Sequence, residues 1–289
     1  MSRFIVVAPG SSEAAVLATD DLARVLGVTT VDALAGTTAT DAALRPASAL
    51  PAAVEAVRAA GEDALIAPAR EASNRAFDHV AWNLNLAAST RAGVILAFDA
   101  EGASAELLTE EITAARLRAE AAAASVVAVI LTGGAPSLEV DVPVLTLPLD
   151  EDAAATLRAA ATPTAVTPLA FQADLIERAR ADRKRIVLPE PDDDRVLQAA
   201  AQVLAAGIAD ITFVGDADYV AKRAGELGLD LSAAQVVSVN DPAYLERYAE
   251  EFARLRAKKG VTLEQAREKV TDVSYFGTMM VHMGDADGM

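Results

Sequence analysis

One stretch, residues 183–215, constrains the fold more than any other, because it has the pattern of a βαβ unit. Three basic residues lead into the apolar residues 186–188, and Pro189 ends the run, which is typical of a short buried parallel strand. The acidic residues 192–194 then suit the positive end of a helix. Gly207 is placed to end that helix before a second apolar run. The pattern predicts two parallel strands joined by a helix.

The residues that follow continue this alternation. A helix at 217–227 and a strand at 235–239 extend the winding to βαβαβ. The next helix should end at Gly260, and we expect its apolar stripe to be buried. That stripe consists of Leu245, Tyr248, Phe252 and Leu255. Thr262 and Gln265 have the spacing of a capping box, which predicts another short helix.

The first half of the chain shows the same alternation of strands and helices. The expected strands are 4–8, 30–33, 63–67, 93–98, 126–131 and 142–147, and the expected helices are 13–26, 51–60, 77–89, 103–122 and 151–160. Pro51 suits a first helical turn. Alternation of this kind indicates a doubly wound parallel sheet.

A stretch rich in threonine, proline and alanine separates the two halves. Residues 161–168 have neither a helical nor a strand period, so we place a linker there. The predicted fold class is therefore α/β, with two doubly wound parallel-sheet domains at 1–160 and 169–289. The second of these is expected to be incomplete.

Composition excludes several classes of function. The net charge of −17 argues against a nucleic-acid surface, which needs clustered Lys and Arg. With no Cys and only two His, neither a disulfide framework nor a thiolate or histidine metal site is expected. No apolar run approaches the ~18 residues of a membrane span, and no leader pattern precedes the first domain. We therefore expect a cytoplasmic protein.

Four blocks of sequence in the second domain together carry a family resemblance. They are 183–215, R-L-R-A-K-K-G at 254–260, V-T-L-E-Q-A-R at 261–267, and V-S-Y-F-G-T-M-M-V-H-M-G-D-A-D-G-M at 273–289. Their order resembles the opening of the catalytic domain of phosphate acetyltransferases. The resemblance covers roughly residues 168–289 and implies the N-terminal half of a phosphate acetyl/butyryltransferase domain.

The first domain resembles the N-terminal domain of the long members of this family, which is similar to the P-loop fold of dethiobiotin synthetase. Residues 84–99 are the best local match. The turn at 9–12 departs from the pattern, because a P-loop needs a second Gly and a Lys that are missing here. We predict a degenerate P-loop-like domain that binds no nucleotide.

The resemblance implies reversible transfer of an acetyl group between acetyl-CoA and phosphate, which gives acetyl phosphate and CoA. It implies no metal, no cofactor apart from the CoA substrate, and a homo-oligomer. The serine, aspartate and late arginine most involved in catalysis are expected beyond Met289. No catalytic residue can therefore be named, and residues 1–289 alone are expected to be inactive.

Two alternatives to this function stay open. One is a phosphate butyryltransferase, because the pocket that sets acyl-chain length is not identified by these blocks. The other is a non-catalytic module for assembly or acetyl-CoA sensing, as in malic enzymes that end in a similar domain. Those fusions carry a dehydrogenase with a G-x-G-x-x-G loop ahead of it, and residues 1–167 contain no such loop.

Arg256 is the main candidate for substrate binding. It lies one position beyond the predicted buried stripe, and the resemblance places it where a family arginine contacts CoA or phosphate. The planar guanidinium suits phosphate oxygens. The alternative is a cation that only stabilises the end of a helix, as Lys258 and Lys259 would do.

Arg195 is the second candidate for substrate binding, at the edge where open α/β sheets bind ligands. It could instead pair with the acidic residues 192–194 just before it. Glu190 could orient Arg195 or be a solvated loop acid. Three adjacent Asp could suggest Mg²⁺, but acids at a helix start are ordinary capping, and no metal is expected. For His282 we favour a packed or surface role.

Overall fold

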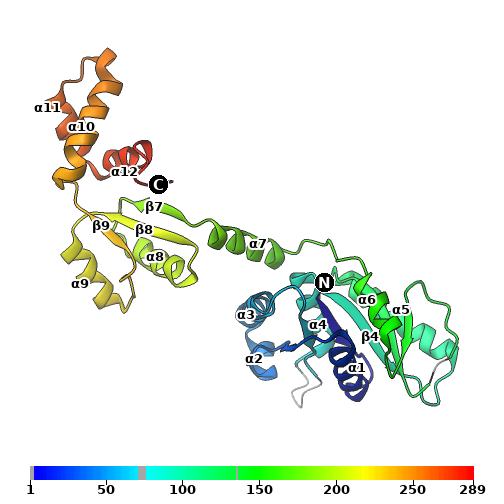
Figure 1. Ribbon diagram of the computed structural model, residues 1–289. Coiled ribbons are helices and arrows are strands. Elements are labelled where there is room, and N and C mark those ends of the chain that lie inside the picture. The colour runs from blue at the N-terminus through cyan, green and yellow to red at the C-terminus, as the bar shows by residue number, and fades with distance from the viewer. Residues whose placement is uncertain (1–2, 71–75, 135) are drawn as a thin grey trace. The chain divides into compact units, whose positions relative to one another are not determined.

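Parallel strands form two separate sheets in the structure, a computed structural model that describes residues 3–70, 76–134 and 136–289 (Figure 1). The chain divides into two compact units, Met1–Ala173 and Asp174–Met289, with one sheet in each. The predicted α/β class with two parallel sheets is confirmed. No helix among the described residues is long and apolar enough to cross a membrane.

The sheet of the first unit has six strands in the order β2-β3-β1-β4-β5-β6, and all neighbours pair in parallel. The strands are β1 (Phe4–Val7), β2 (Thr30–Asp32), β3 (Leu65–Ala67), β4 (Gly93–Asp99), β5 (Val126–Thr132) and β6 (Val144–Thr146). Among the described residues β6 lies at the edge of this sheet, next to β5, which suits a strand preceded by Pro143. Almost every side chain of β1 and β4 is buried, as expected for strands covered on both faces.

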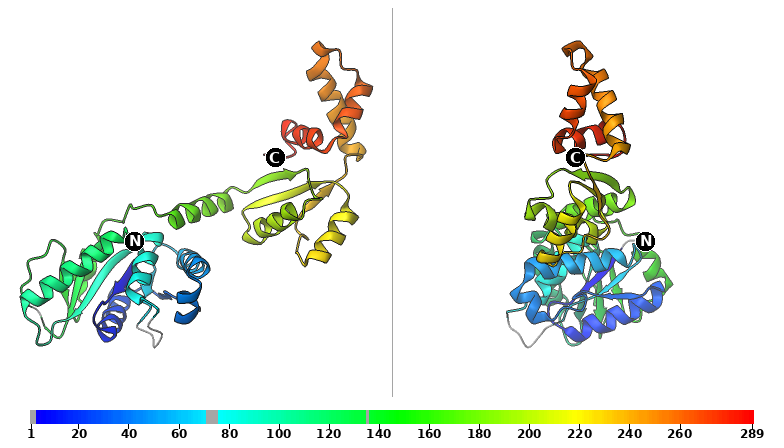
Figure 2. Two further views of the ribbon diagram at one scale, coloured as in Figure 1. Left: turned by 180° about the vertical axis from the view of Figure 1, so that it is seen from behind. Right: turned by 90° about the vertical axis from the view of Figure 1, so that its left-hand side faces the viewer.

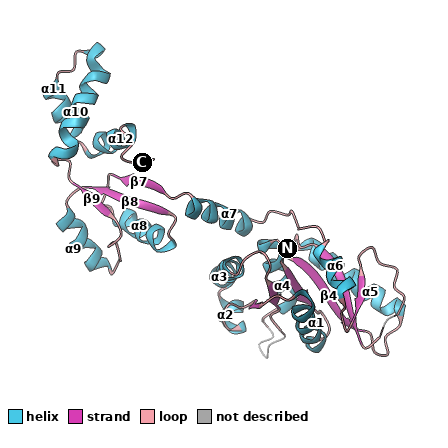
Figure 3. Ribbon diagram, viewed as in Figure 1, coloured by secondary structure: helices cyan, strands magenta, loops and turns pink. Residues whose placement is uncertain are grey.

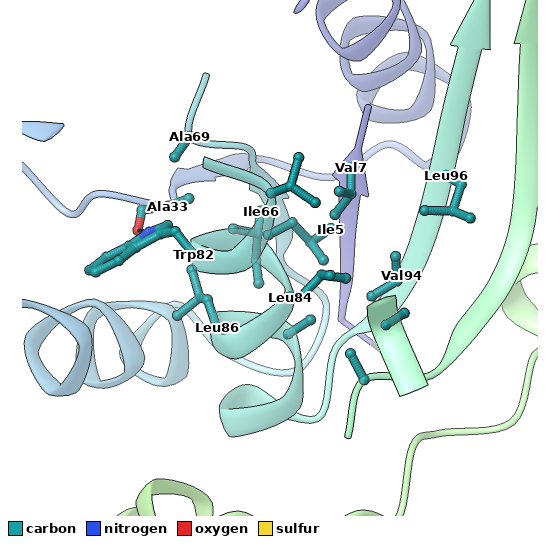
Figure 4. Packing of buried hydrophobic residues seen from close by; sticks show 14 of the residues in the cluster. Ile5, Val7, Ala33, Ile66, Ala69, Trp82, Leu84, Leu86, Val94 and Leu96 are labelled. Atoms are coloured by element: carbon teal, nitrogen blue, oxygen red, sulfur yellow. Dashed lines mark hydrogen bonds between the residues drawn. The ribbon is translucent and has the colours of Figure 1, made fainter. Parts of the chain in front are cut away.

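Helices cover both faces of this sheet (Figure 3). They are α1 (Ser12–Leu26), α2 (Ala39–Leu44), α3 (Pro46–Ala59), α4 (His79–Thr90), α5 (Ala105–Ala121) and α6 (Glu151–Arg158). α1 and α6 pack on one face and α2 to α5 on the other. In the core on the face covered by α2 to α5, the Nε1 of Trp82 on α4 donates a hydrogen bond to the carbonyl of Ala33 at 3.0 Å (Figure 4).

Two features of this unit differ from the expected elements. No helix was expected at 39–44, where Thr38 caps the short helix α2 that the weak apolar period does not indicate. The helix predicted to begin at Pro51 begins at Pro46, which takes the first-turn position instead. Pro51 lies inside α3, where it removes one backbone hydrogen bond. The helix continues because Ala53, Val54 and Val57 are buried.

The second unit is built on β7 (Lys184–Leu188), β8 (Ala209–Val214) and β9 (Gln235–Val237), in that order and parallel. Its helices are α8 (Asp194–Ala206), α9 (Ala217–Leu227), α10 (Pro242–Arg256), α11 (Leu263–Val270) and α12 (Val273–His282), with a 3₁₀ turn at Ala257–Lys259. A further helix, α7 (Pro168–Ala181), contains the division between the units, and residues 161–167 before it are in neither helix nor strand. The predicted βαβαβ winding is confirmed.

Alternating side chains of the three strands point to two cores. Ile211 and Phe213 pack under α8 and α9, whereas Val187, Val214 and Val237 pack under α10, α11 and α12. The helices of this unit accordingly lie on both faces of its sheet (Figure 2). The apolar stripe of α10 is buried at Tyr248 and Phe252 and half-buried at Leu245. Its last member was predicted wrongly. Leu255 is 46% exposed, because it lies at the rim of a surface pocket rather than under α12.

Candidate functional site

Arg256 is the last residue of α10. Asp241 caps the start of this helix, Pro242 occupies its first turn, and burial of Tyr248 and Phe252 fixes its rotation. The rotation leaves Arg256 exposed, with its guanidinium carbon 5.7 Å from the centre of the Phe252 ring. Arg256 follows the exposed Leu255, four residues after the buried Phe252, and its charged side chain lies over that aromatic ring.

A pocket of about 450 Å³ opens beside Arg256, between α10 and α12. Its walls are Phe252, Leu255, Arg256, Ser274, Tyr275, Thr278, Met279 and His282. Phe252 and Tyr275 meet edge to face with their ring centres 5.7 Å apart, which gives the pocket an aromatic floor. A mostly apolar concave surface with one cation is suited to a ligand that has both an apolar and an anionic part.

Glu251 determines which side chains near this pocket are available to bind an anionic ligand. Its carboxylate accepts a hydrogen bond from Arg254 at 2.6 Å and lies 2.8 Å from the Nε2 of His282. Hydrogen bonds from Arg254 and then from His282 lower the pKa of Glu251 to about 2. In the described part of the chain no carboxylate pairs with Arg256, or with the nearby Lys258 and Lys259. Arg256 is therefore free to bind an anion.

Arg195 lies at the start of α8 and is already paired. It donates to the carboxylate of Asp193 from Nε at 3.1 Å and from a terminal nitrogen at 2.6 Å, and its side chain is 88% exposed. The hydrogen bond from the Arg195 side chain, followed by that from its backbone N–H, lowers the pKa of Asp193 to about 2. Arg195 is not among the residues that line the Arg256 pocket. Its role in substrate binding stays a prediction.

The acidic residues 192–194 line a different pocket, of about 650 Å³, together with Tyr219, Lys222, Arg223 and Glu226. Asp193 caps α8 and holds Arg195, and Asp194 accepts two hydrogen bonds from Arg223 at 2.7 and 2.5 Å. Two of the three acids thus serve capping and ion pairing. Glu190 is exposed beside them, and the hydrogen bonds and ion pair of the Arg195 side chain among the described residues go to Asp193.

The structure also shows a set of contacts that the sequence analysis missed. Asp287 accepts hydrogen bonds from the backbone N–H of Arg185 at 2.8 Å and from its guanidinium at 2.8 and 3.2 Å. Asp285 accepts from the hydroxyl of the buried Tyr248 at 2.6 Å and pairs with Arg247. The alternating acids of G-D-A-D-G were a signal for such pairing. Their partners lie 37 to 102 residues away, beyond any local pattern.

The matches to known proteins fall mainly on the second unit. Residues 170–289 match the family model described as phosphate acetyl/butaryl transferase. The chain is 55% identical over 119 residues to the phosphate acetyltransferase of Corynebacterium glutamicum, covering 41% of this chain and 36% of the relative. It is 47% identical over 124 residues to that of Nitratidesulfovibrio vulgaris, covering 43% and 18%.

Among solved structures, the chain matches a phosphotransacetylase from Streptococcus pyogenes at 32% identity and a TM-score of 0.41, covering 43% of this chain and 37% of that one. The chain spans about a third of the length of the C. glutamicum relative and less than a fifth of that from N. vulgaris. All of these matches concern about two fifths of the chain. These matches all fall on residues similar to the phosphate acetyl/butaryl transferase family model, which spans 170–289.

Proposed function

We propose that this chain is part of a phosphate acetyltransferase that interconverts acetyl-CoA plus phosphate and acetyl phosphate plus CoA. The family match of residues 170–289 supports the reaction class. The single structural observation that carries the proposal is Arg256, an exposed guanidinium with no carboxylate partner among the described residues, at the edge of a largely apolar pocket. Both substrates carry phosphate groups, which arginine binds well.

In the proposed reaction the sulfur of CoA attacks the carbonyl carbon of acetyl phosphate. A C–S bond forms, the C–O bond to phosphate breaks, and the thiol proton is lost to a base. Arg256 contributes by holding a phosphate group, so its effect is on substrate binding and orientation rather than on proton transfer. We further propose that no metal or cofactor takes part and that the enzyme acts in the cytoplasm as a homo-oligomer.

The test is an assay of the full-length protein for acetyl-CoA formation from acetyl phosphate and CoA, followed by the absorbance of the thioester. Turnover that depends on both substrates supports the proposal. Binding of acetyl-CoA without turnover would instead support a non-catalytic sensing or assembly module, the alternative raised by malic enzyme fusions.

A phosphate butyryltransferase is the second candidate, because the description of the matching family includes both acyl groups. The two candidates predict opposite preferences in a series of acyl phosphates of increasing chain length. A kcat/KM that is highest for the acetyl substrate supports the first. A maximum at the butyryl substrate would replace it with the second.

A further inference from the structure

His282 is the last residue of α12, and its side chain lines the pocket beside Arg256. The side chain is 42% exposed, so the imidazole ring is open to solvent at the pocket wall. Its Nε2 atom lies 2.8 Å from the Oε1 of Glu251 on α10. Among the residues that the structure places, none forms a hydrogen bond with Nδ1, the other ring nitrogen. His282 therefore brings a ring nitrogen that is still available to the same pocket as the guanidinium of Arg256.

The carboxylate of Glu251 also fixes which ring nitrogen of His282 is protonated. Hydrogen bonds from Arg254 and then from His282 lower the pKa of Glu251 to about 2, so the carboxylate is ionised at neutral pH. An ionised carboxylate only accepts hydrogen bonds, and Nε2 must therefore be the protonated nitrogen of the neutral ring. Nδ1 is then an acceptor, and its lone pair repels an anion. Protonation of the ring converts Nδ1 into a charged donor and keeps the hydrogen bond from Nε2 to Glu251.

The other charged groups around the pocket do not change charge between about pH 5 and pH 8, the range in which an imidazole ordinarily does. On α10, Arg256 is permanently charged and Arg254 is held by its ion pair with the ionised carboxylate. On α11, the Nζ of Lys269 lies 4.3 Å from the centre of the Tyr275 ring. The strands β7 and β8 pack against α12 through apolar side chains. His282 is thus the one described side chain in the pocket wall that can respond to pH in this range.

The acids that follow α12 are engaged outside the pocket. Asp285 pairs with Arg247 and accepts a hydrogen bond from the hydroxyl of Tyr248 at 2.6 Å. Asp287 pairs with Arg185 of β7 at 2.8 Å. Neither carboxylate lines the pocket, so neither competes with a bound anion for the imidazole ring.

We propose that His282 is a second anion-binding residue of the Arg256 pocket and that it contributes only in its protonated form. Glu251 holds the ring through Nε2 and leaves Nδ1 for the ligand. Arg256 supplies a positive charge at every pH, and His282 adds a second one as the pH falls. The pocket therefore binds a tetrahedral oxyanion, such as a phosphate group, more tightly at low pH. The inference rests on the proposed function for the identity of this anion as part of a substrate.

The test is the affinity of inorganic sulfate for the full-length protein at about pH 5.5 and about pH 8, measured by calorimetry. Sulfate keeps the same charge over this range, so a change in its affinity comes from the protein. His282→Gln retains a side chain that can donate to Glu251 but cannot become charged. His282→Lys is charged at both pH values. His79→Gln is the matched control, because it removes the other histidine of the chain, at the start of α4 in the first unit.

We expect the dissociation constant of the parent and of His79→Gln to rise by about three- to tenfold from the lower to the higher pH, because a charge-assisted hydrogen bond at an exposed site is lost. His282→Gln should bind weakly at both pH values, and His282→Lys tightly at both. Arg256→Ala should bind more weakly than the parent at each pH, as expected if sulfate occupies this pocket.

Three results would overturn the proposal. They are a dissociation constant of the parent that does not change with pH, a rise of the same size in His282→Gln, and unchanged sulfate binding in Arg256→Ala. If His282→Gln does not fold, a rise of the parent's size in His282→Lys overturns it equally. Sulfate binding requires no turnover, so failure of the proposed function is seen separately, as absence of acetyl-CoA formation.

Discussion

Arg195 and Arg256 are both exposed arginines at helix ends in the second unit, but their surroundings differ. Arg195 is bound by the carboxylate of Asp193, two residues before it. Arg256 is followed by lysines and packs on Phe252, and the nearby acid Glu251 is occupied by Arg254 and His282. The comparison shows that exposure alone does not make an arginine available to an anionic ligand. The neighbouring carboxylates must also be paired with other cations.

The largest expected effect separates the two arginines directly. Arg256→Ala should raise the KM for CoA or acetyl phosphate by about ten- to a hundredfold, because a charge-assisted contact to phosphate contributes ~1.5–3 kcal/mol. Steady-state kinetics of the full-length enzyme measure this change. Arg256→Lys should restore only part of the loss, since an ammonium cannot form two parallel hydrogen bonds to one phosphate.

Arg195→Ala is the matched control, with the same charge removed from the same unit. It should change KM by less than about threefold if Arg195 only pairs with Asp193, as expected for an exposed ion pair. Equal losses in the two variants would show that the pairing of Arg195 in the structure does not keep it from the substrate. Unchanged kinetics in Arg256→Ala would assign that residue to the helix end alone.

The same contrast explains how far sequence alone could go. Alternation of strands and helices gave both parallel sheets, because each element has a local apolar period. Arg256 was identified mainly from the family resemblance, with its place beyond the predicted stripe of α10 as local support. The pairing of Asp285 and Asp287 with residues far along the chain could not be foreseen, since no local pattern specifies a contact over about a hundred residues. For Arg195 the sequence left open whether it binds substrate or pairs with the acidic residues 192–194. In the structure it pairs with Asp193.

The second prediction concerns the anchoring of α10, on which the position of Arg256 depends. Burial and a hydrogen bond to Asp285 raise the pKa of Tyr248, so its hydroxyl stays protonated and donates. Asp285→Ala leaves this buried donor without an acceptor and should lower the free energy of unfolding by about 1–3 kcal/mol. Urea unfolding measures the loss. Asp182→Ala, at an exposed pair with Lys184, should change it by less than about 0.5 kcal/mol.

Glu251 provides a smaller effect that depends on pH. Its folded pKa of about 2 lies below the ordinary 4.5, so its ion pairs stabilise the folded state fully above pH 4.5 and less as the pH falls toward 2. Glu251→Gln should therefore be less stable than the parent at pH 7, and the difference should shrink between pH 4.5 and 2. Unfolding midpoints in urea across this range test the prediction. A difference that is constant with pH would contradict it.

The last prediction is that ATP does not bind, and it compares the turn after β1 in the first unit with the surroundings of Arg256 in the second. The turn after β1 precedes α1, as in a phosphate-binding loop, but the hydroxyl of Ser11 accepts the N–H of Ala14 at 3.2 Å. The next side chain, Glu13, puts a negative charge in the first turn, and no Lys follows to bind a phosphate. ATP added to the chain in a calorimeter should therefore give no binding heat, while CoA should give heat through the second unit. Micromolar affinity for ATP would show that a helix start without the P-loop lysine can bind nucleotide here, and that the free cation of Arg256 is not what distinguishes the two units.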